Sequence, residues 1–281
     1  MTTTATTRQL GGRYSLGHTP AEYERLRAQA RMWDSATGRL LDQVGLEPGA
    51  SCLDAGCGPG ETMRAMAERV GPAGRVLGVD ADAALGGMTL QMLRGAGYRQ
   101  CAFHAQDLAA GEPIPGAPFD LVYARLLLFH LPQRVDVLSR LWEAVAPGGH
   151  LLVQDFDLRG VTSLPELDSM ADGLRLVTGA FGAASADVSA GARLPQLFTE
   201  AGVGIPDGTD VAGHLVPLAA ASAQLEQVVR SVLPTALAHR ITTEDDAEAL
   251  LAAMDRDVCR FPDLPTLMPL LISAWKRKGQ P

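Results

Sequence analysis

The stretch Ser51–Thr62, which reads SCLDAGCGPGET, decides the fold. A short apolar run leads into Asp54, glycines follow at positions 56, 58 and 60, and a helical pattern begins at Glu61. This order predicts a strand, a glycine-rich turn and a helix N-terminus, an arrangement that brings a nucleotide-like ligand against bare backbone. Gly56 and Gly58 can adopt positive φ and carry no Cβ that would block the ligand.

The acid and the glycine spacing distinguish this stretch from a dinucleotide-binding turn. Its glycines follow G-x-G-x-G rather than G-x-G-x-x-G, and Asp54 precedes the first of them. A carboxylate there would repel a pyrophosphate above the helix N-terminus, whereas it suits a ligand that offers a cation or a donor, such as the ammonium of an amino-acid moiety. A nicotinamide dehydrogenase is therefore disfavoured.

The segment LDAGCGPG closely resembles motif I of the class I S-adenosylmethionine-dependent methyltransferases, of the small-molecule, UbiE-like type. The resemblance implies S-adenosylmethionine as the cofactor and S-adenosylhomocysteine as the product. The alternative is a tight β–α turn in another Rossmann-like protein.

The composition is ordinary for a soluble globular protein, with 47% hydrophobic and 20% charged residues. The 281 residues suffice for one large α/β domain with an elaboration, or for two small domains. A net charge of −8 argues against nucleic acid as a partner, because phosphate binding needs a basic surface. The basic cluster Lys276–Lys278 is expected to be a solvated tail.

Cysteine usage and the N-terminal sequence indicate a cytoplasmic protein. The four cysteines form no C-x-x-C pair and are expected to be reduced and mostly buried. None of the six histidines is paired at metal-ligand spacing, so no metal is expected. Residues 1–9 are polar and rich in threonine, unlike a signal peptide, and no apolar run reaches membrane-spanning length.

Two further acids follow predicted strands. The strand Arg75–Asp80 ends in an acid about one β-α-β half-unit after the glycine-rich turn, a position from which a carboxylate bonds ribose hydroxyls. Asp82 is better placed to cap the next helix. After the strand Cys101–Ala105, the resemblance implies that Asp107 bonds the adenine amino group and that the next backbone N–H reaches a ring nitrogen. The alternative role of Asp107 is to cap the loop.

The segment after a fourth strand, Phe119–Ala124, is expected beside the ligand crevice. Arg125 could meet the carboxylate of the cofactor's methionine part. His130 is a candidate general base, because unperturbed imidazole titrates near neutrality. A His-Leu-Pro before a helix also resembles a structural feature of this family, in which the ring braces the loop. Tyr14 is the second candidate for orienting the acceptor.

The resemblance also assigns contacts with the cofactor residue by residue. The matching positions are Asp54, Gly56, Cys57, Gly58, Gly60, Asp80, Ala81, Gln106, Asp107, Leu108 and Arg125.

The first half of the chain alternates strands with helices. An amphipathic helix is expected over Pro132–Ala146, stopped by the Pro-Gly-Gly at 147–149, with a strand over His150–Phe156. The resemblance runs from about Gly45 to Asp157. It predicts a Rossmann-like, doubly wound, seven-stranded and mainly parallel sheet, with ligands at the carboxyl ends of the strands.

Residues 1–45 are expected to form a tail and a helical cap, with helices over residues 21–32 and 35–44. Such helices commonly fold over the ligand crevice, so the candidates for covering it are Tyr14, Tyr23, Arg27 and Gln29. Residues 46–157 are then the cofactor-binding half, and residues 158–281 supply lid helices and the remaining strands of the same domain.

The second half is less regular. A helical pattern between residues 160 and 190 suggests a lid, and Arg193–Gly202 suggests the last crossover helix. Strands are expected within Gly208–Val216 and near Leu267–Trp275, with helices over Ala220–Leu237 and Thr243–Asp257 between them. The apolar residues that either line an acceptor pocket or form core are Leu174, Leu176, Phe181, Leu194, Leu197 and Phe198.

The sequence thus favours a methyltransferase that acts on a small, apolar or aromatic metabolite of the natural-product type. Neither nucleic acid nor membrane insertion is expected, and a homodimer stays open. Two alternatives remain. One is an enzyme of this fold that binds S-adenosylmethionine but catalyses a cyclisation or decarboxylation, and the other is a non-enzymatic binding protein.

Overall fold

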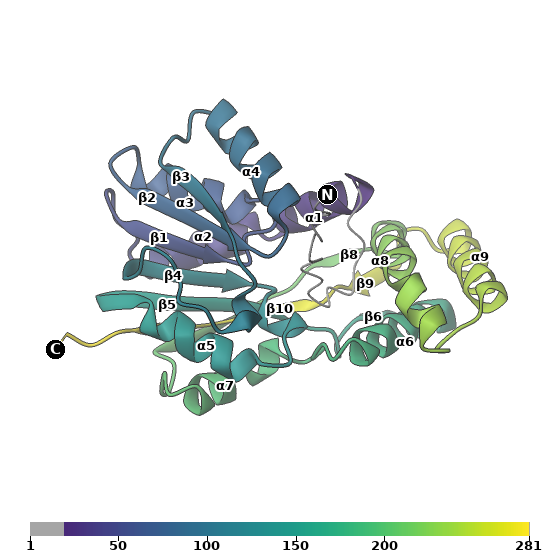
Figure 1. The fold of residues 1–281 in the computed structure, drawn as a ribbon. Helices are drawn as coiled ribbons and strands as arrows, with labels where there is room; N and C mark the ends of the chain where they lie inside the picture. The colour runs from purple at the N-terminus through teal and green to yellow at the C-terminus, as the bar shows by residue number, and fades with distance from the viewer. Residues whose placement is uncertain (1–19, 281) are drawn as a thin grey trace, which may run out of the picture.

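The computed structural model describes residues 20–280 and contains a seven-stranded sheet in the order β3-β2-β1-β4-β5-β10-β7 (Figure 1). Strand β10 runs antiparallel to both of its neighbours, and the other strands are parallel to one another. The strands of this sheet are β1 (Ser51–Ala55), β2 (Arg75–Asp80), β3 (Cys101–Ala105), β4 (Phe119–Arg125), β5 (Val145–Asp157), β7 (Gly208–Ala212) and β10 (Leu270–Arg277). The predicted mainly parallel, doubly wound sheet is confirmed.

Helices cover both faces of this sheet. On one face, α2 (Asp34–Gln43) and α3 (Glu61–Val70) pack over β1 and its neighbours, with α4 (Ala83–Gly95) over β2 and β3. On the other face, α5 (Arg134–Glu143) and α7 (Leu194–Glu200) enclose the second apolar core. Because both faces of the sheet are buried, the central strands are short apolar runs in which apolar and polar residues do not alternate.

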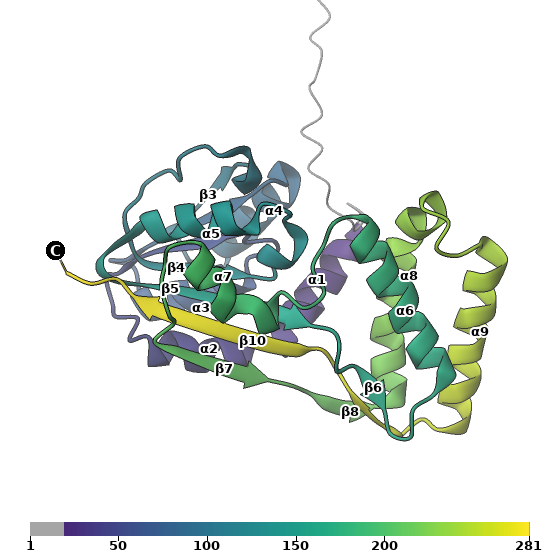
Figure 2. The same ribbon diagram turned by 90° about the horizontal axis from the view of Figure 1, so that it is seen from below.

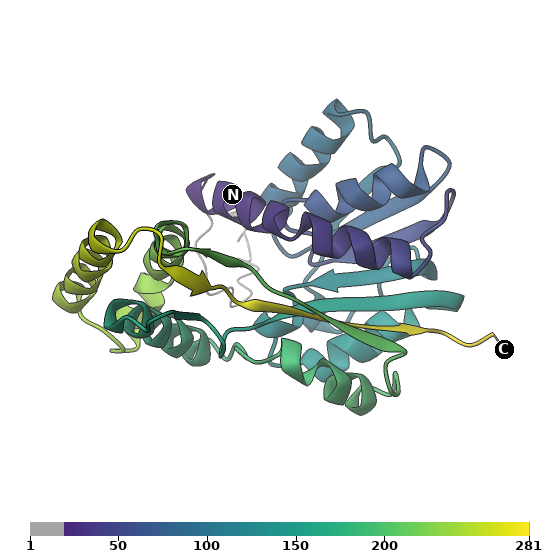
Figure 3. The ribbon, with the colours of Figure 1, turned by 180° about the vertical axis from the view of Figure 1, so that it is seen from behind.

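A separate layer of helices stands beyond the carboxyl ends of the parallel strands (Figure 2). It consists of α6 (Asp168–Ala183), α8 (Leu218–Ala238) and α9 (Glu244–Arg260), called the lid helices below. Helix α1 (Pro20–Met32) lies between the large sheet and the lid helices (Figures 2 and 3). No helix within residues 20–280 is long and apolar enough to cross a membrane.

The sequence did not predict the small sheet beside the lid helices. The expected strand within Gly208–Val216 is divided into β7 and a second strand, β8 (Leu215–Pro217). The latter joins β9 (Pro265–Leu267) and β6 (Thr162–Ser163) in a three-stranded antiparallel sheet. These strands are too short to show a period of two, so only their long-range pairing defines them.

The boundary between α5 and β5 differs from the prediction. The helix ends at Glu143, and Val145 already pairs with Phe119, so the Pro-Gly-Gly at 147–149 lies inside the strand at an irregularity rather than behind the helix. The backbone N–H of Phe119 donates to the Ala144 carbonyl at 2.9 Å and fixes this switch.

The prediction that the basic cluster Lys276–Lys278 forms a solvated tail is wrong. Its first two residues belong to β10, and Lys276 Nζ lies 3.1 Å from Asp207 Oδ1. Lys278 Nζ donates to the carbonyls of Trp142 at 2.9 Å and Val145 at 2.8 Å. Its ammonium therefore satisfies carbonyls at the C-terminus of α5, where the helix dipole favours a cation.

Candidate functional site

A cavity of about 1140 Å³ opens at the carboxyl ends of β1, β2, β3 and β4. The loops after these strands line one part of it, called the cofactor half below, and the lid helices α6 and α8 with the end of β5 line the other, called the acceptor half. Residues of α1 also line the cavity. Open parallel sheets bind their ligands at this edge.

The glycine-rich turn after β1 forms the floor of the cofactor half. Gly56, Cys57 and Gly58 line the cavity, and the two glycines have φ values of +72° and +47°. Gly60 was predicted to contact the cofactor, but it is not among the lining residues. A Cβ on Gly60 would lie 2.3 Å from Thr89 Cγ2, so this glycine lets α4 pack behind the turn.

Asp54 presents a buried carboxylate at the cavity. Its side chain is only 2% exposed, and no residue within 20–280 donates a hydrogen bond to its Oδ2 atom. Burial raises the pKa of Asp54 to about 7, while the charge of Arg125 lowers it and that of Asp80 raises it further. An unsatisfied acceptor beside a backbone that carries no Cβ fits the ammonium group of an amino-acid moiety.

Asp80 lines the cavity and also holds the turn in place. Its carboxylate accepts from the backbone N–H of Gly58 at 2.9 Å and of Asp82 at 2.9 Å. Burial raises its pKa, an effect these bonds oppose. Asp82 caps α4 by accepting from Ala84 and Leu85, as predicted, and also accepts from the hydroxyl of Tyr23 at 2.9 Å.

The loop after β3 places Gln106, Asp107 and Leu108 on the cavity wall, and Ala81 lies beside them. Asp107 Oδ1 accepts from the backbone N–H of Ala109 at 2.8 Å, which is the capping role that had been the alternative interpretation. Gln106 Nε2 donates to two backbone carbonyls, and its Oε1 has no partner in the described part of the chain. The wall therefore offers both a carboxylate and an unsatisfied amide oxygen.

Arg125 belongs to a buried polar chain that the sequence did not predict. Its Nη1 donates to Thr37 Oγ1 at 3.0 Å, and Thr37 donates to Gln154 Oε1 at 2.8 Å. Tyr123 also donates to Gln154 Oε1, and Gln154 Nε2 donates to Ser273. The available signal was Gln154 directly after the apolar run Leu151–Val153 in the predicted strand.

His130 lies on the cavity wall within an aromatic cluster. Its ring centroid is 4.8 Å from that of Phe129 and 6.2 Å from that of Phe181, and all three residues line the cavity. Burial lowers the pKa of His130 to about 4, and the charge of Arg25 adds to this effect. The imidazole is therefore neutral at pH 7 and a weak base. Tyr14, the other catalytic candidate, lies outside the described residues.

The short helix that carries His130, Leu128–His130, is anchored by an acid the sequence analysis missed. Asp155 Oδ2 accepts from the backbone N–H of Phe129 at 3.1 Å, and Asp187 N donates to the Phe129 carbonyl at 2.8 Å. Burial raises the pKa of Asp155 to about 7. These two bonds fix the loop through the backbone of Phe129 rather than through the His130 ring, so both interpretations of His130, as a base and as a brace, stay predictions.

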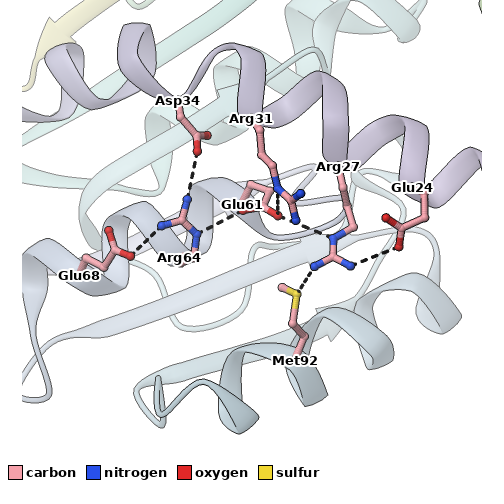
Figure 4. A network of polar contacts seen from close by, with 8 residues as sticks. All are labelled: Glu24, Arg27, Arg31, Asp34, Glu61, Arg64, Glu68 and Met92. Carbon is pink, nitrogen blue, oxygen red and sulfur yellow. Dashed lines mark hydrogen bonds and ion pairs between the residues drawn. The ribbon is translucent and has the colours of Figure 1, made fainter.

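Helix α1 covers the cavity with one side and binds α3 with another. Tyr23 and Gln29 line the cavity, as proposed from the sequence, but Arg27 does not. Arg27 and Arg31 lie 3.7 and 3.4 Å from the carboxylate of Glu61 (Figure 4). Glu61 is 4% exposed and also pairs with Arg64 at 3.2 Å, so one buried acid at the start of α3 holds the cap helix.

The apolar residues singled out in the second half divide between wall and core. Leu174 and Phe181 on α6 line the acceptor half. Leu176 packs among the lid helices, and Leu194, Leu197 and Phe198 pack beneath the large sheet. The acceptor half is thus apolar, but of the six predicted residues only Leu174 and Phe181 line it.

The fold is Rossmann-like, and its site fits a nucleoside cofactor that carries an amino-acid moiety. The family model described as "Methyltransferase domain" matches residues 52–149. Residues 52–149 therefore match a methyltransferase domain, which supports the predicted class I S-adenosylmethionine-dependent family and its cofactor.

Curated relatives share part of this chain. The chain is 37% identical over 120 residues to the trans-aconitate 2-methyltransferase of Paracidovorax citrulli, which covers 43% of this chain and 44% of the relative. The chain thus matches less than half the length of that relative.

Solved structures extend the similarity over most of the fold. A putative methyltransferase from Bacillus halodurans matches with a TM-score of 0.59 and 15% identity, over 88% of this chain and all of the other. A Haemonchus contortus phosphoethanolamine N-methyltransferase in complex with S-adenosylhomocysteine matches with a TM-score of 0.52 and 16% identity, over 88% of this chain and 53% of the other.

Proposed function

We propose that this chain transfers the methyl group of S-adenosylmethionine to a small, apolar or aromatic metabolite of the natural-product type. The observation that carries the proposal is the single cavity that joins the glycine-rich turn and its buried acid to an apolar wall on the lid helices. A cavity of about 1140 Å³ exceeds the usual ~300–1,000 Å³ of a single-ligand site, so it has room for donor and acceptor together.

The cofactor half supplies a distinct contact for each part of the cofactor. Asp54 and the backbone of Gly56–Gly58 would hold the methionine part, with Arg125 toward its carboxylate. Asp80 and Ala81 would hold the ribose, and Gln106, Asp107 and Leu108 the adenine. Gly60 is left out of this set, because it supports the turn from behind.

When bound, the cofactor supplies a methyl group that its sulfonium has already activated. The chain's own residues then have to align the acceptor with that group and exclude water, and orientation alone can supply several kcal/mol. The aromatic cluster of Phe129, His130 and Phe181 is placed to orient an acceptor. A strong base is not required for an acceptor that arrives without a proton to lose.

Trans-aconitate is the second candidate acceptor, because relatives such as the Paracidovorax citrulli enzyme are named for it. Its three carboxylates would need cationic partners. Of the residues that line the acceptor half, none on α6, α8 or the end of β5 is basic.

Titration calorimetry with S-adenosylmethionine, S-adenosylhomocysteine and NAD tests the cofactor, and mass spectrometry of candidate acceptors tests for a gain of one methyl group. We expect micromolar binding of the two sulfur ligands, none of NAD, and transfer to an apolar acceptor. Binding without methyl gain on any acceptor would favour the non-methylating alternative. Failure of both sulfur ligands to bind would refute the enzymatic proposal.

A further inference from the structure

Among the residues that the structure describes, the acceptor half contains no side chain that could take a proton. It is formed by the end of β5 and the segment that follows, by α6 and α8, and by two residues before β10. These residues are Phe156, Leu158, Val161, Met170, Leu174, Val177, Phe181, Ala221, Gln224, Leu225, Gln227, Val228, Met268 and Pro269. None of them is an acid, a lysine, a cysteine, a tyrosine or a histidine.

Tyr23 and His130 also line the cavity, and neither is a good base. The hydroxyl of Tyr23 donates to Asp82, and burial and this bond raise the pKa of Tyr23. His130 faces the charge of Arg25 from α1, while Asp155 from β5 binds the backbone of its neighbour Phe129. Burial leaves the imidazole neutral at pH 7, with little tendency to gain a proton.

The remaining charged groups near His130 are already paired. Arg134 on α5 donates to the Leu128 carbonyl at 3.3 Å and lies 3.7 Å from Asp187. Asp187 also pairs with Arg193 at 2.8 Å. No acid among the described residues of the acceptor wall therefore replaces His130 as a base.

Among the described residues, two arginines line the cavity, and Arg25 is the one whose charge acts on His130. Arg25 lines the cavity from α1, its Nη1 donates to Gln29 Oε1 at 2.7 Å, and its charge acts on the His130 ring. Arg125, the other arginine on the wall, is bonded to Thr37 and acts on Asp54 in the cofactor half. An acceptor with several charges would leave all but one of them against apolar side chains, which is strongly unfavourable.

Building on the proposed methyl transfer, we infer that the acceptor is an apolar molecule with one oxygen nucleophile that is already ionised at neutral pH, and that Arg25 orients this oxygen. Acidic phenols, enolates and single carboxylates share this chemistry. The oxygen lone pair forms the new O–C bond while the bond from the methyl carbon to sulfur breaks and its electron pair stays on sulfur. The negative oxygen and the positive sulfur both become neutral, so no proton has to move.

A matched pair of acceptors tests the absence of a base. The probes are 4-phenylphenol and its 2,6-difluoro analogue, which have nearly the same size but differ in the acidity of the hydroxyl. Because an ordinary phenol with a pKa near 10 is about 0.1% ionised at pH 7, we expect the difluoro analogue to be methylated more than about tenfold faster in kcat/KM. The pH profile should follow the pKa of each phenol. Equal rates, with one profile shared by both phenols, would overturn the inference while confirming methyl transfer.

A binding measurement tests the role of Arg25 without turnover. The absorbance of the difluoro analogue reports its ionisation when it is bound to the protein with S-adenosylhomocysteine. We expect its pKa to fall on binding by about one unit, a tenfold preference for the phenolate. Arg25→Gln should abolish this shift. The matched control is Arg31→Gln, on the same helix but 57% exposed and paired with Glu61 outside the cavity.

The outcomes of the binding measurement separate the inference from the proposed function. If binding lowers the pKa of the difluoro analogue in a way that depends on Arg25, but neither phenol is methylated, the result would support the anion site and count against methyl transfer. A pKa raised on binding, or a loss of the shift in both variants alike, would overturn the assignment of Arg25. Methylation of trans-aconitate in preference to the phenols would overturn the singly charged acceptor.

Discussion

The affinity for S-adenosylmethionine should depend on pH through Asp54. Burial raises the pKa of this carboxyl group to about 7, with Arg125 opposing the shift and Asp80 adding to it, and the Met63 backbone N–H donates to it. In the proposed site the cofactor's ammonium binds the carboxylate and not the neutral acid, so binding must release the proton that Asp54 carries below pH 7. Affinity should therefore fall as the pH is lowered.

The magnitude follows from the ionised fraction. With a pKa of about 7, roughly one half of the Asp54 side chains are ionised at pH 7 and about one in thirty at pH 5.5. The apparent Kd should rise about fifteenfold over this range, which corresponds to between about 1 and 2 kcal/mol. The amino group of the cofactor stays protonated throughout, since α-amino groups titrate near pH 8.

Titration calorimetry at pH 5.5, 6.2 and 7, repeated in two buffers of different ionisation enthalpy, measures both the affinity and the protons released. Asp54→Asn is the control, and it should bind weakly at every pH with no proton release. A wild-type affinity that stays constant over this range, or an unchanged dependence in Asp54→Asn, would refute the assignment of Asp54 to the ammonium.

Four further predictions concern single side chains. Gly60→Ala should lower the free energy of unfolding by more than about 2 kcal/mol in a urea titration, because φ is +77° and the new Cβ meets Thr89. Glu61→Gln should cost about 2 kcal/mol, less than the ~3–5 kcal/mol of a fully buried pair because its arginines keep contact with water; protease cleavage within α1 should become faster, and unchanged cleavage would exclude Glu61 as its anchor. The folded pKa of Asp155 is about 7 against an ordinary 3.8, so the folded state retains a proton that the unfolded chain loses, and stability should decline as pH rises from 4 to 7. Asp155→Asn should flatten that decline in thermal melts, whereas a stability that increases over this range would show the sign to be wrong. Lys278→Met should lower stability by about 1 kcal/mol, since carbonyls at the end of α5 lose their cation; no change in the urea midpoint would contradict the capping role.

Local patterns explain why much of the large sheet could be predicted. The sequence predicted the bounds of β2 and β3 and the start of α3 as the structure has them. The cap at Asp82 was also predictable, because its bonds reach only two and three residues along the chain. Where neighbours in sequence determine the structure, the sequence is sufficient.

Features determined by distant residues could not be predicted in this way. The end of α5 depends on Lys278 and on pairing with Phe119, which lie far from it in the chain. Gly86 in α4 had no explanation from the sequence; in the structure a Cβ there would lie 1.9 Å from the ring of Phe103 on β3. From the sequence, Arg27 and Gln29 were equally good candidates for lining the cavity. In the structure Arg27 pairs with Glu61 and does not line the cavity, whereas Gln29 does.

His130 shows why the chemistry of the site is harder to predict than its location. Imidazole in water titrates near neutrality, so the sequence favours a base wherever a histidine follows a strand at the ligand edge. In the structure His130 does line the cavity at this edge, but burial lowers the pKa of its ring to about 4. A site with so weak a base can still align the two reactants. Because no side chain removes a proton from the acceptor, the acceptor oxygen then has to be ionised before it binds. When the cofactor is saturating, the acidity of the acceptor, rather than that of His130, should therefore set the pH dependence of methyl transfer.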